Sequence, residues 1–364
     1  MSAADSAHPT YLPALDGMRA CSILIVLLSH AWLGRIVPGG LGVTMFFFIS
    51  GFIITRLMLA EWSRDGRLDI GAFYVRRLCR ITPALIAFVA CSLVAMGLVG
   101  ADIRAQEIAA VFLYAANYYD IFVGFGVGQP LYPFPITWSL AVEEHYYFVF
   151  PFLFVLLVRH RMRFMLVIGA LVLAALLWRY YLDVVVGFDN LRHNRIYKAT
   201  DTRFDSILYG ALFALLLDQG ARIRQALAHP ITFWVGALLM LGSLALRDAV
   251  FRETLRYAMQ GGALICMMST LVLVPSIWQR LLSTPIMRYV GRISYSLYLF
   301  HWLVLGLVEL CLGDQPYPLR FTVLMVGSFA AAHLSYRFVE VPGQRLRKPL
   351  MRVLGISTRK VHGG

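Results

Sequence analysis

The feature that most constrains this chain is the recurrence of long apolar runs from one end to the other. A helix needs about 17–25 mostly apolar residues to cross the hydrocarbon core of a bilayer. Hydrophobic residues make up 59% of the 364 residues, whereas charged residues make up only 15%. A soluble domain usually has about 25% charged residues. The composition therefore excludes ordinary soluble domains and predicts one polytopic, all-α transmembrane helical bundle.

Ten apolar runs are candidate spans, and an eleventh run, 107–121, is short and contains the sequence NYYD. If 107–121 crossed, the basic clusters at 76–80 and 159–163 would lie on opposite sides, against the positive-inside rule. We therefore expect 107–121 to lie at the interface or to re-enter the membrane. This gives ten spans with both termini cytoplasmic. The predicted spans are 17–35, 42–61, 82–100, 138–158, 164–182, 204–218, 231–247, 257–275, 293–312 and 319–339.

The net charge of +13 does not indicate nucleic-acid binding, because the basic residues gather in short loops between apolar runs, where they set orientation. The predicted outer loop 183–203 is an exception, since it is basic as well. The five cysteines form no CxxC pair, which favours neither a disulfide framework nor a metal site. We expect a cytoplasmic tail at 1–10, one membrane domain at 11–343 and a basic cytoplasmic tail at 344–364.

The first span carries polar residues on one face. Arg19 and His30 are 11 residues apart, which places them on nearly the same helix face and about 16 Å apart along the axis. Asp16 can share that face, either as a partner for Arg19 or as a helix cap. The ordinary interpretation is that Arg19 anchors the helix at the interface and that His30 hydrogen-bonds to a neighbouring helix.

Two further spans also carry polar groups. His301 follows Tyr298 by three positions in one span, and Glu143 follows Ser139 by four positions in another, so each pair shares a helix face. Ionisable residues are costly inside a bilayer and usually face a bundle interior. Together the three spans indicate one shared polar cavity.

With these residues assembled, the chain resembles the acyltransferase-3 family of integral membrane O-acyltransferases. The resemblance extends over the whole chain and rests on seven motifs that follow the family's order. They are LDGMRA with His30 eleven residues after Arg19, GGLGVTMFFFISGFIIT at 39–55, FYVRRLCRITPAL at 73–85, TWSLAVEEHYY at 137–147, RFDSILYG at 203–210, GRISYSLYLFHW at 291–302 and VEVP at 339–342.

The resemblance implies transfer of an acyl group, usually acetyl, from cytoplasmic acyl-CoA to a hydroxyl of a carbohydrate acceptor, such as a surface polysaccharide or a lipid-linked glycan. Arg77 and Arg80, with Arg76 beside them, would then bind the phosphates of CoA. The alternative is that these arginines form only a basic cytoplasmic loop that orients the chain in the membrane. His30 would be the general base or would be transiently acylated. Arg19 would bind the donor or stabilise an oxyanion.

The remaining site residues follow from the same resemblance. Glu143 would orient the histidine or hold an acceptor hydroxyl, and His301 would take part in catalysis. Trp138 would stack on a sugar ring, unless it is only an interfacial anchor. No metal is expected. The residues assigned to substrate binding are Asp16, Trp138, Ser139, Arg203, Asp205 and Tyr298.

Two alternatives stay open from the sequence. The acceptor can be a macrolide or another small secreted metabolite. The chain can also be a proton-coupled transporter in which His30, Glu143 and His301 form a relay, although no repeat symmetry supports this. The expected location is a bacterial cytoplasmic (inner) membrane, and the expected partners are the lipid bilayer, acyl-CoA and the acceptor. The oligomeric state is undetermined, with a homodimer as one alternative.

Overall fold

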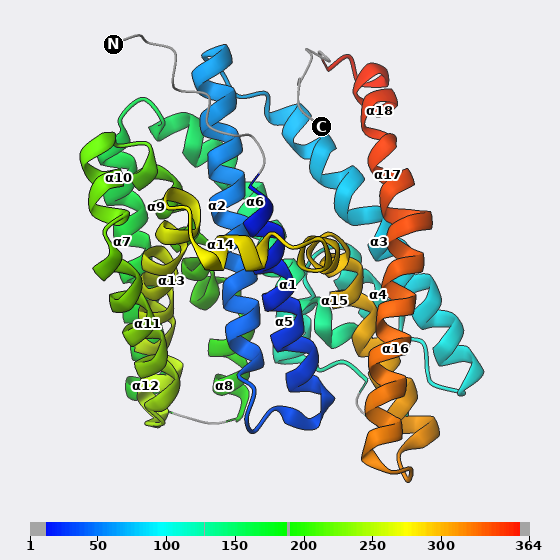
Figure 1. The fold of residues 1–364 in the computed structure, drawn as a ribbon. Helices are drawn as coiled ribbons and strands as arrows, with labels where there is room; N and C mark the ends of the chain where they lie inside the picture. The colour runs from blue at the N-terminus through cyan, green and yellow to red at the C-terminus, as the bar shows by residue number, and fades with distance from the viewer. Residues whose placement is uncertain (1–11, 127, 188–189, 357–364) are drawn as a thin grey trace.

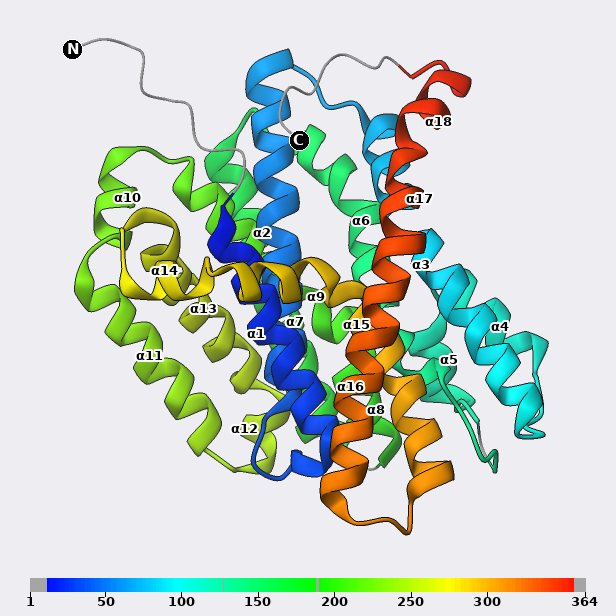
Figure 2. The same cartoon turned by 45° about the vertical axis from the view of Figure 1, so that its right-hand side comes forward.

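The computed structural model describes residues 12–126, 128–187 and 190–356. Within these ranges the chain is helical and contains no strand, which confirms the predicted all-α class. The helices Gly39–Asp65 and Tyr317–Ser335 run in a similar direction, whereas the helix Ile70–Leu98 is inclined to them (Figures 1 and 2). The helices are α1 (Pro13–Leu28), α2 (Gly39–Asp65), α3 (Ile70–Leu98), α4 (Ala105–Phe112), α5 (Ala116–Phe122), α6 (Trp138–Leu157), α7 (Arg161–Tyr180), α8 (Asn190–Lys198), α9 (Thr200–Leu217), α10 (Ala221–Leu227), α11 (Pro230–Ala245), α12 (Ala249–Glu253), α13 (Leu255–Leu273), α14 (Ile277–Leu282), α15 (Pro285–Leu312), α16 (Tyr317–Ser335), α17 (Val341–Arg345) and α18 (Arg347–Val353).

Six helical segments are long and apolar enough to cross a membrane, and a pair bent by 56°, α10 with α11, qualifies as a broken seventh. These segments coincide with seven of the ten predicted spans. The other three predicted spans form α9, α13 and α16, which are helices of 18 to 19 residues that do not meet the same criterion. The count of ten is therefore not confirmed. The six segments are Pro13–Leu33, Gly39–Asp65, Ile70–Leu98, Phe134–Leu157, Arg161–Val185 and Pro285–Leu312.

The short run 107–121 does not form one continuous helix. It is divided between α4 and α5, and Tyr114 between them has a φ of 54°. A non-glycine residue with positive φ is uncommon and interrupts regular helix geometry. Neither α4, with 8 residues, nor α5, with 7, is long enough to cross a bilayer alone.

The two ends of the molecule carry different elements. The connection from α2 to α3 lies at the same end as α18, which we call the α18 end (Figures 1 and 2). The loop at 34–38 and α12 lie at the opposite end, which we call the α12 end. The helix α2 runs from one end towards the other through the centre of the bundle.

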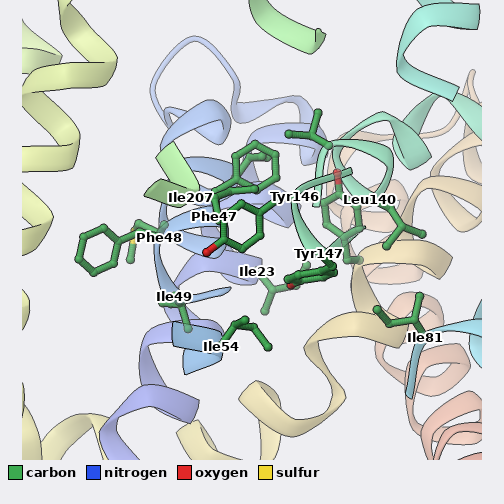
Figure 3. Packing of buried hydrophobic residues seen from close by; sticks show 14 of the residues in the cluster. Ile23, Phe47, Phe48, Ile49, Ile54, Ile81, Leu140, Tyr146, Tyr147 and Ile207 are labelled. Carbon is green, nitrogen blue, oxygen red and sulfur yellow. The ribbon is translucent and has the colours of Figure 1, made fainter. Parts of the chain in front are cut away.

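Close helix crossings fix the centre of the bundle. A Cβ atom at Gly51 of α2 would lie 1.9 Å from the carbonyl oxygen of Ile207, and one at Gly210 of α9 would lie 1.9 Å from that of Phe48. Small residues allow helix backbones to approach this closely in membrane proteins. Buried side chains including Phe47, Phe48 and Tyr147 pack around α2 (Figure 3). This packing holds the polar residues of α1, α2 and α6 at fixed positions.

Candidate active site

A cavity at the centre of the bundle brings together polar residues from α1, α2, α3, α6 and α15. We call it the central cavity. His30 and His301 do not line it, but six other residues predicted to form a site do. They are Arg19, Arg77, Arg80, Ser139, Glu143 and Tyr298.

Arg19 is held towards this cavity by α15. Its Nε and Nη2 atoms donate to the hydroxyl of Ser294 at 3.2 and 3.1 Å. The helices α1 and α15 approach closely at this level, because a Cβ at Gly291 would lie 1.9 Å from the carbonyl oxygen of Asp16. The backbone contact therefore sets the position from which Arg19 reaches into the cavity.

Arg77 and Arg80 both line the central cavity and also a second cavity towards the α18 end, which contains Arg76 and Arg347 as well. We call the second one the α18-end cavity. The Arg77 guanidinium lies 4.1 Å from the centroid of the Tyr147 ring, a cation–π distance that fixes its position. Arg76 forms an ion pair with Glu61 at 3.1 Å. The predicted arginine pair thus projects from one face of α3 between the two cavities.

Glu143 does not contact His30, contrary to one of the two roles predicted for it. Its Oε1 accepts a hydrogen bond from Ser50 at 2.9 Å, and its Oε2 accepts one from Tyr147 at 3.2 Å. Glu143 instead faces Arg19, Arg77 and Arg80 across the central cavity. A carboxylate among three guanidinium groups partly balances their charge.

His30 lies where α1 loses regular helical geometry. A π-helical turn covers Ser29–Leu33, and within it Ala31 has a ψ of 39° and Trp32 a φ of 63°. The imidazole of His30 packs edge-on against Trp302 with ring centroids 4.9 Å apart. Its Nδ1 atom lies 3.0 Å from Nε2 of His301 on α15. The two intramembrane histidines predicted separately from the sequence are therefore one hydrogen-bonded pair.

The direction of this hydrogen bond follows from the partner of His301. Nδ1 of His301 lies 3.0 Å from the carbonyl oxygen of Leu297, and a carbonyl can only accept, so that nitrogen carries the proton. With both rings neutral, Nε2 of His301 accepts and Nδ1 of His30 donates. Nε2 of His30 is then left with an unshared electron pair.

A third cavity surrounds His30, and we call it the histidine cavity. Its lining includes Trp138, Tyr197 and Trp302, so aromatic rings face the imidazole from three elements. Tyr298 lies between this cavity and the central one, and its hydroxyl is 2.6 Å from that of Ser139 and donates to the carbonyl of Ile136 at 3.1 Å.

The cavities form a series through the molecule because neighbours share lining residues. The α18-end and central cavities share Arg77 and Arg80, and the central and histidine cavities share Val43 and Tyr298. A fourth cavity at the α12 end, the vestibule, adjoins the histidine cavity. The central cavity, at about 80 Å³, is the smallest of the four. The vestibule and histidine cavity share Ser29, Gly39, Gly40 and Tyr197.

Three residues predicted to bind substrate do not line the central or histidine cavity: Asp16, Arg203 and Asp205. Asp205 is fully buried and forms an ion pair with Arg179 at 2.7 Å. Arg203 is fully buried beneath the ring of Tyr257, at 4.0 Å from its centroid. Asp16 lies at the crossing of α1 with α15. Asp205 therefore belongs to the packing between α7 and α9 in this structure.

Sequence reasoning missed several lining residues. Tyr147 and Ser50 hold Glu143, and Tyr197 and Trp302 line the histidine cavity. Trp302 could have been predicted, because it directly follows His301 in the sequence. Tyr197 could not, because it lies in a basic segment without a periodic pattern. Among the residues that the structure describes, no group of three or more His, Cys, Asp or Glu side chains is placed to hold a metal ion.

Comparison with known proteins adds a family match over most of the chain. Residues 12–337 match the family described as Acyltransferase domain (Acyl_transf_3). O-acetyltransferase OatA of Staphylococcus aureus strain NCTC 8325 / PS 47 is 29% identical over 354 residues, which cover 92% of this chain and 57% of that protein. A provisionally named O-acetyltransferase of S. aureus strain COL is 30% identical over 348 residues, which cover 91% of this chain and 57% of that protein.

The chain thus spans little more than half the length of these curated relatives. The matching region contains every residue that lines the central and histidine cavities. No solved structure matches the chain.

Proposed function

Since the chain belongs to the acyltransferase-3 family, we propose that it is an integral membrane O-acyltransferase that moves an acetyl group from acetyl-CoA to a hydroxyl of a carbohydrate acceptor. The similarity to proteins named O-acetyltransferase supports acetyl as the acyl group. The observation that carries the proposal is the series of cavities that runs from an arginine-lined entrance to the unshared electron pair of His30.

The donor enters from the α18 end. CoA carries several phosphate charges, and guanidinium groups bind phosphate through paired, charge-assisted hydrogen bonds. Arg76, Arg77 and Arg80 line the α18-end cavity, and Arg19 lies further in along the central cavity. The small central cavity admits the narrow thioester arm more readily than a sugar ring. Arg19 is about 16 Å from His30 along the helix axis, which favours donor binding over oxyanion stabilisation.

His30 acts as the general base at the far end of this path. Its Nε2 removes the proton from the acceptor hydroxyl as the oxygen attacks the acetyl carbonyl. The tetrahedral intermediate collapses, the C–S bond breaks, and the protonated His30 returns its proton to the CoA thiolate. His301 is a positioning residue, because it accepts from Nδ1 of His30 and so fixes the tautomer that leaves Nε2 available.

Transient acylation of His30 is the other route. Nε2 would then attack the thioester itself, and the acetyl group would pass to the acceptor in a second step. The same tautomer serves both routes. Rapid acid quench of the protein with radiolabelled acetyl-CoA distinguishes them, since only the second route leaves label on the protein.

The acceptor meets the donor from the α12 end, where Trp138 lines the histidine cavity and can stack on a sugar ring. This arrangement fits ten spans with both termini cytoplasmic and with 11–343 as the membrane domain, in a bacterial cytoplasmic membrane. Acetyl-CoA then enters the protein from the cytoplasm, and the acceptor enters it from the outside.

The direct test combines cells and purified protein. Mass spectrometry of surface glycans from a strain lacking the gene should show loss of the acetyl mass increment, and the His30→Ala variant should not restore it. Purified protein in lipid nanodiscs should release free CoA thiol from acetyl-CoA faster when the deacetylated glycan is added. Unchanged glycans in the deletion strain, together with no glycan-dependent thiol release, would overturn the proposal.

A further inference from the structure

The vestibule at the α12 end is the largest of the four cavities, at about 430 Å³, and the proposed acyl transfer uses none of its charged residues. It adjoins the histidine cavity through Ser29, Gly39, Gly40 and Tyr197. A molecule that places a hydroxyl at His30 therefore has room to extend its other parts into the vestibule.

Positive charge dominates the lining of this cavity. In the part of the chain that the structure describes, its four arginines form no ion pair. Arg256 donates a 3.3 Å hydrogen bond to the hydroxyl of Tyr257, and Glu253 is the one carboxylate in the lining. Like charges that converge on one cavity repel each other and attract an anion. The four are Arg35, Arg247, Arg252 and Arg256.

A buried polar side chain lies in the same wall. Gln260 is 2% exposed and lines the vestibule. An amide offers two N–H donors and a carbonyl acceptor. Gln260 is thus positioned to hydrogen-bond to a ligand.

A further cation lies behind the wall. The rings of Tyr257 and Tyr197, which line the vestibule, stack on the guanidinium of Arg203 at 4.0 and 5.4 Å from their centroids. Arg203 is fully buried, and its Nε and Nη1 atoms have no hydrogen-bond partner in the described structure. Asp205 does not neutralise it, because that carboxylate is paired with Arg179. The charge of Arg203 therefore adds to the positive potential of the vestibule.

From these observations we propose that the vestibule binds an anionic group of the acceptor, a carboxylate or a phosphate, so that the protein selects negatively charged saccharides. The planar fork of arginine fits both anions. Gln260 adds a neutral hydrogen bond beside them. The inference rests on the proposed function only in taking the vestibule as the entrance of the acceptor.

A binding experiment without acetyl-CoA tests this separately from catalysis. The full chain in phosphatidylcholine nanodiscs is titrated with hyaluronan hexasaccharide, which carries carboxylates, and with the neutral chitohexaose. We expect the charged ligand to bind about tenfold more tightly, with the ratio falling as salt screens the charges. In the variant Arg247→Gln/Arg252→Gln/Arg256→Gln the ratio should fall to near one while chitohexaose binding is unchanged.

Two controls keep the test decisive. Arg345→Gln/Lys348→Gln/Arg352→Gln removes three exposed positive charges at the α18 end and should retain the full ratio. Arg247→Lys/Arg252→Lys/Arg256→Lys keeps the charge and should retain most of the binding ratio, which separates lost charge from lost folding.

Competition by inorganic phosphate or by acetate then identifies the anion that fits better. Equal binding of both saccharides by the unmodified protein, or an unchanged ratio in the glutamine variant, would overturn the proposal even if acyl transfer is confirmed.

Discussion

His30 Nδ1 lies 3.0 Å from His301 Nε2, and His301 Nδ1 lies 3.0 Å from the carbonyl oxygen of Leu297. The Leu297 carbonyl, the His301 ring and the His30 ring are thus hydrogen-bonded in a row. When both rings are neutral, only one arrangement of protons is compatible with this row, because the carbonyl cannot donate. This arrangement leaves the Nε2 electron pair of His30 unshared, and His30 lines the histidine cavity. A backbone atom of α15 thereby determines the protonation pattern of a side chain in the π-helical turn that follows α1.

His30→Ala should abolish acetyl transfer while the protein still inserts and folds. Losing a general base typically costs about 10²–10⁴-fold in rate, and removing an imidazole from an apolar span does not hinder insertion. The measurement is acceptor-dependent release of CoA thiol by protein in nanodiscs. His160→Ala, at an exposed position in the connection from α6 to α7, is the matched control and should be fully active. Near-normal transfer by His30→Ala would remove this residue from the mechanism.

Variants of His301 should separate positioning from packing. His301→Leu removes the acceptor for His30 Nδ1. It should lower kcat by about tenfold or more, because other enzymes lose activity when the group that orients a catalytic histidine is replaced. The KM for acetyl-CoA should be unchanged. His301→Gln supplies an amide oxygen that can accept from Nδ1, so it should recover part of kcat. Steady-state kinetics at varied acetyl-CoA gives both constants. If leucine and glutamine variants are equally impaired, the role of His301 is packing alone.

The crossing of α2 and α9 offers a stability test. Gly51→Ala would place a Cβ 1.9 Å from the carbonyl oxygen of Ile207, so the helices must separate, at a cost of about 1–3 kcal/mol. Thermal unfolding in detergent should show a clearly lower Tm. Gly169→Ala in α7 meets no atom within 4 Å and should leave the Tm unchanged or raise it, since alanine favours helix. Equal Tm values for the two variants would contradict the tight crossing.

Much of this site was predictable because intramembrane polar residues are rare enough to stand out. Arg19, Glu143 and His301 lie on three separate spans, and their cost in lipid predicts a common cavity. The partner of His30 was not predictable, since helix periodicity gives the face of a residue but not which neighbouring helix it meets. Asp205 shows a second limit of the sequence. Its place beside a span suggested substrate binding, yet Arg179 of α7, itself unremarkable in sequence, neutralises it.

The span count illustrates a similar limit. Apolar runs predict helices well, and all ten predicted runs are helical in the structure. Whether a helix of 18 to 19 residues crosses depends on its charges and its neighbours. In α9 the charged residues Asp201, Arg203 and Asp205 lie in the first two turns. The burial of Arg203 and Asp205 inside the bundle cannot be read from the sequence.

Membrane topology can be measured by cysteine labelling in a background without the five native cysteines. A cysteine at Asp102, an exposed residue near the α12 end of α3, should react with a membrane-impermeant maleimide added outside. A cysteine at His160 should react only after the membrane is opened. This outcome follows if 107–121 does not cross. Labelling of both positions from the same side would require an additional crossing between them and would rule out the ten-span arrangement.

The last prediction concerns donor binding by Arg77 and Arg80, which line both the α18-end and the central cavity. Arg77→Ala/Arg80→Ala should chiefly raise the apparent KM for acetyl-CoA, because each lost charge-assisted contact to a phosphate costs about 1.5–3 kcal/mol. Arg77→Lys/Arg80→Lys should recover binding only in part, since an ammonium keeps the charge but lacks the planar fork. Steady-state kinetics and direct titration of acetyl-CoA give the two readouts.

Arg163→Ala/Arg280→Ala removes the same charge from exposed positions outside these cavities, so it controls for a general loss of positive potential and should bind acetyl-CoA normally. His30→Ala should also bind acetyl-CoA normally, because a general base acts in the transition state and a loss there appears in kcat. The two sets of variants therefore separate binding from chemistry. If Arg77→Ala/Arg80→Ala binds acetyl-CoA as tightly as the unmodified protein, these arginines only orient the chain in the membrane, and the donor must be held by other residues.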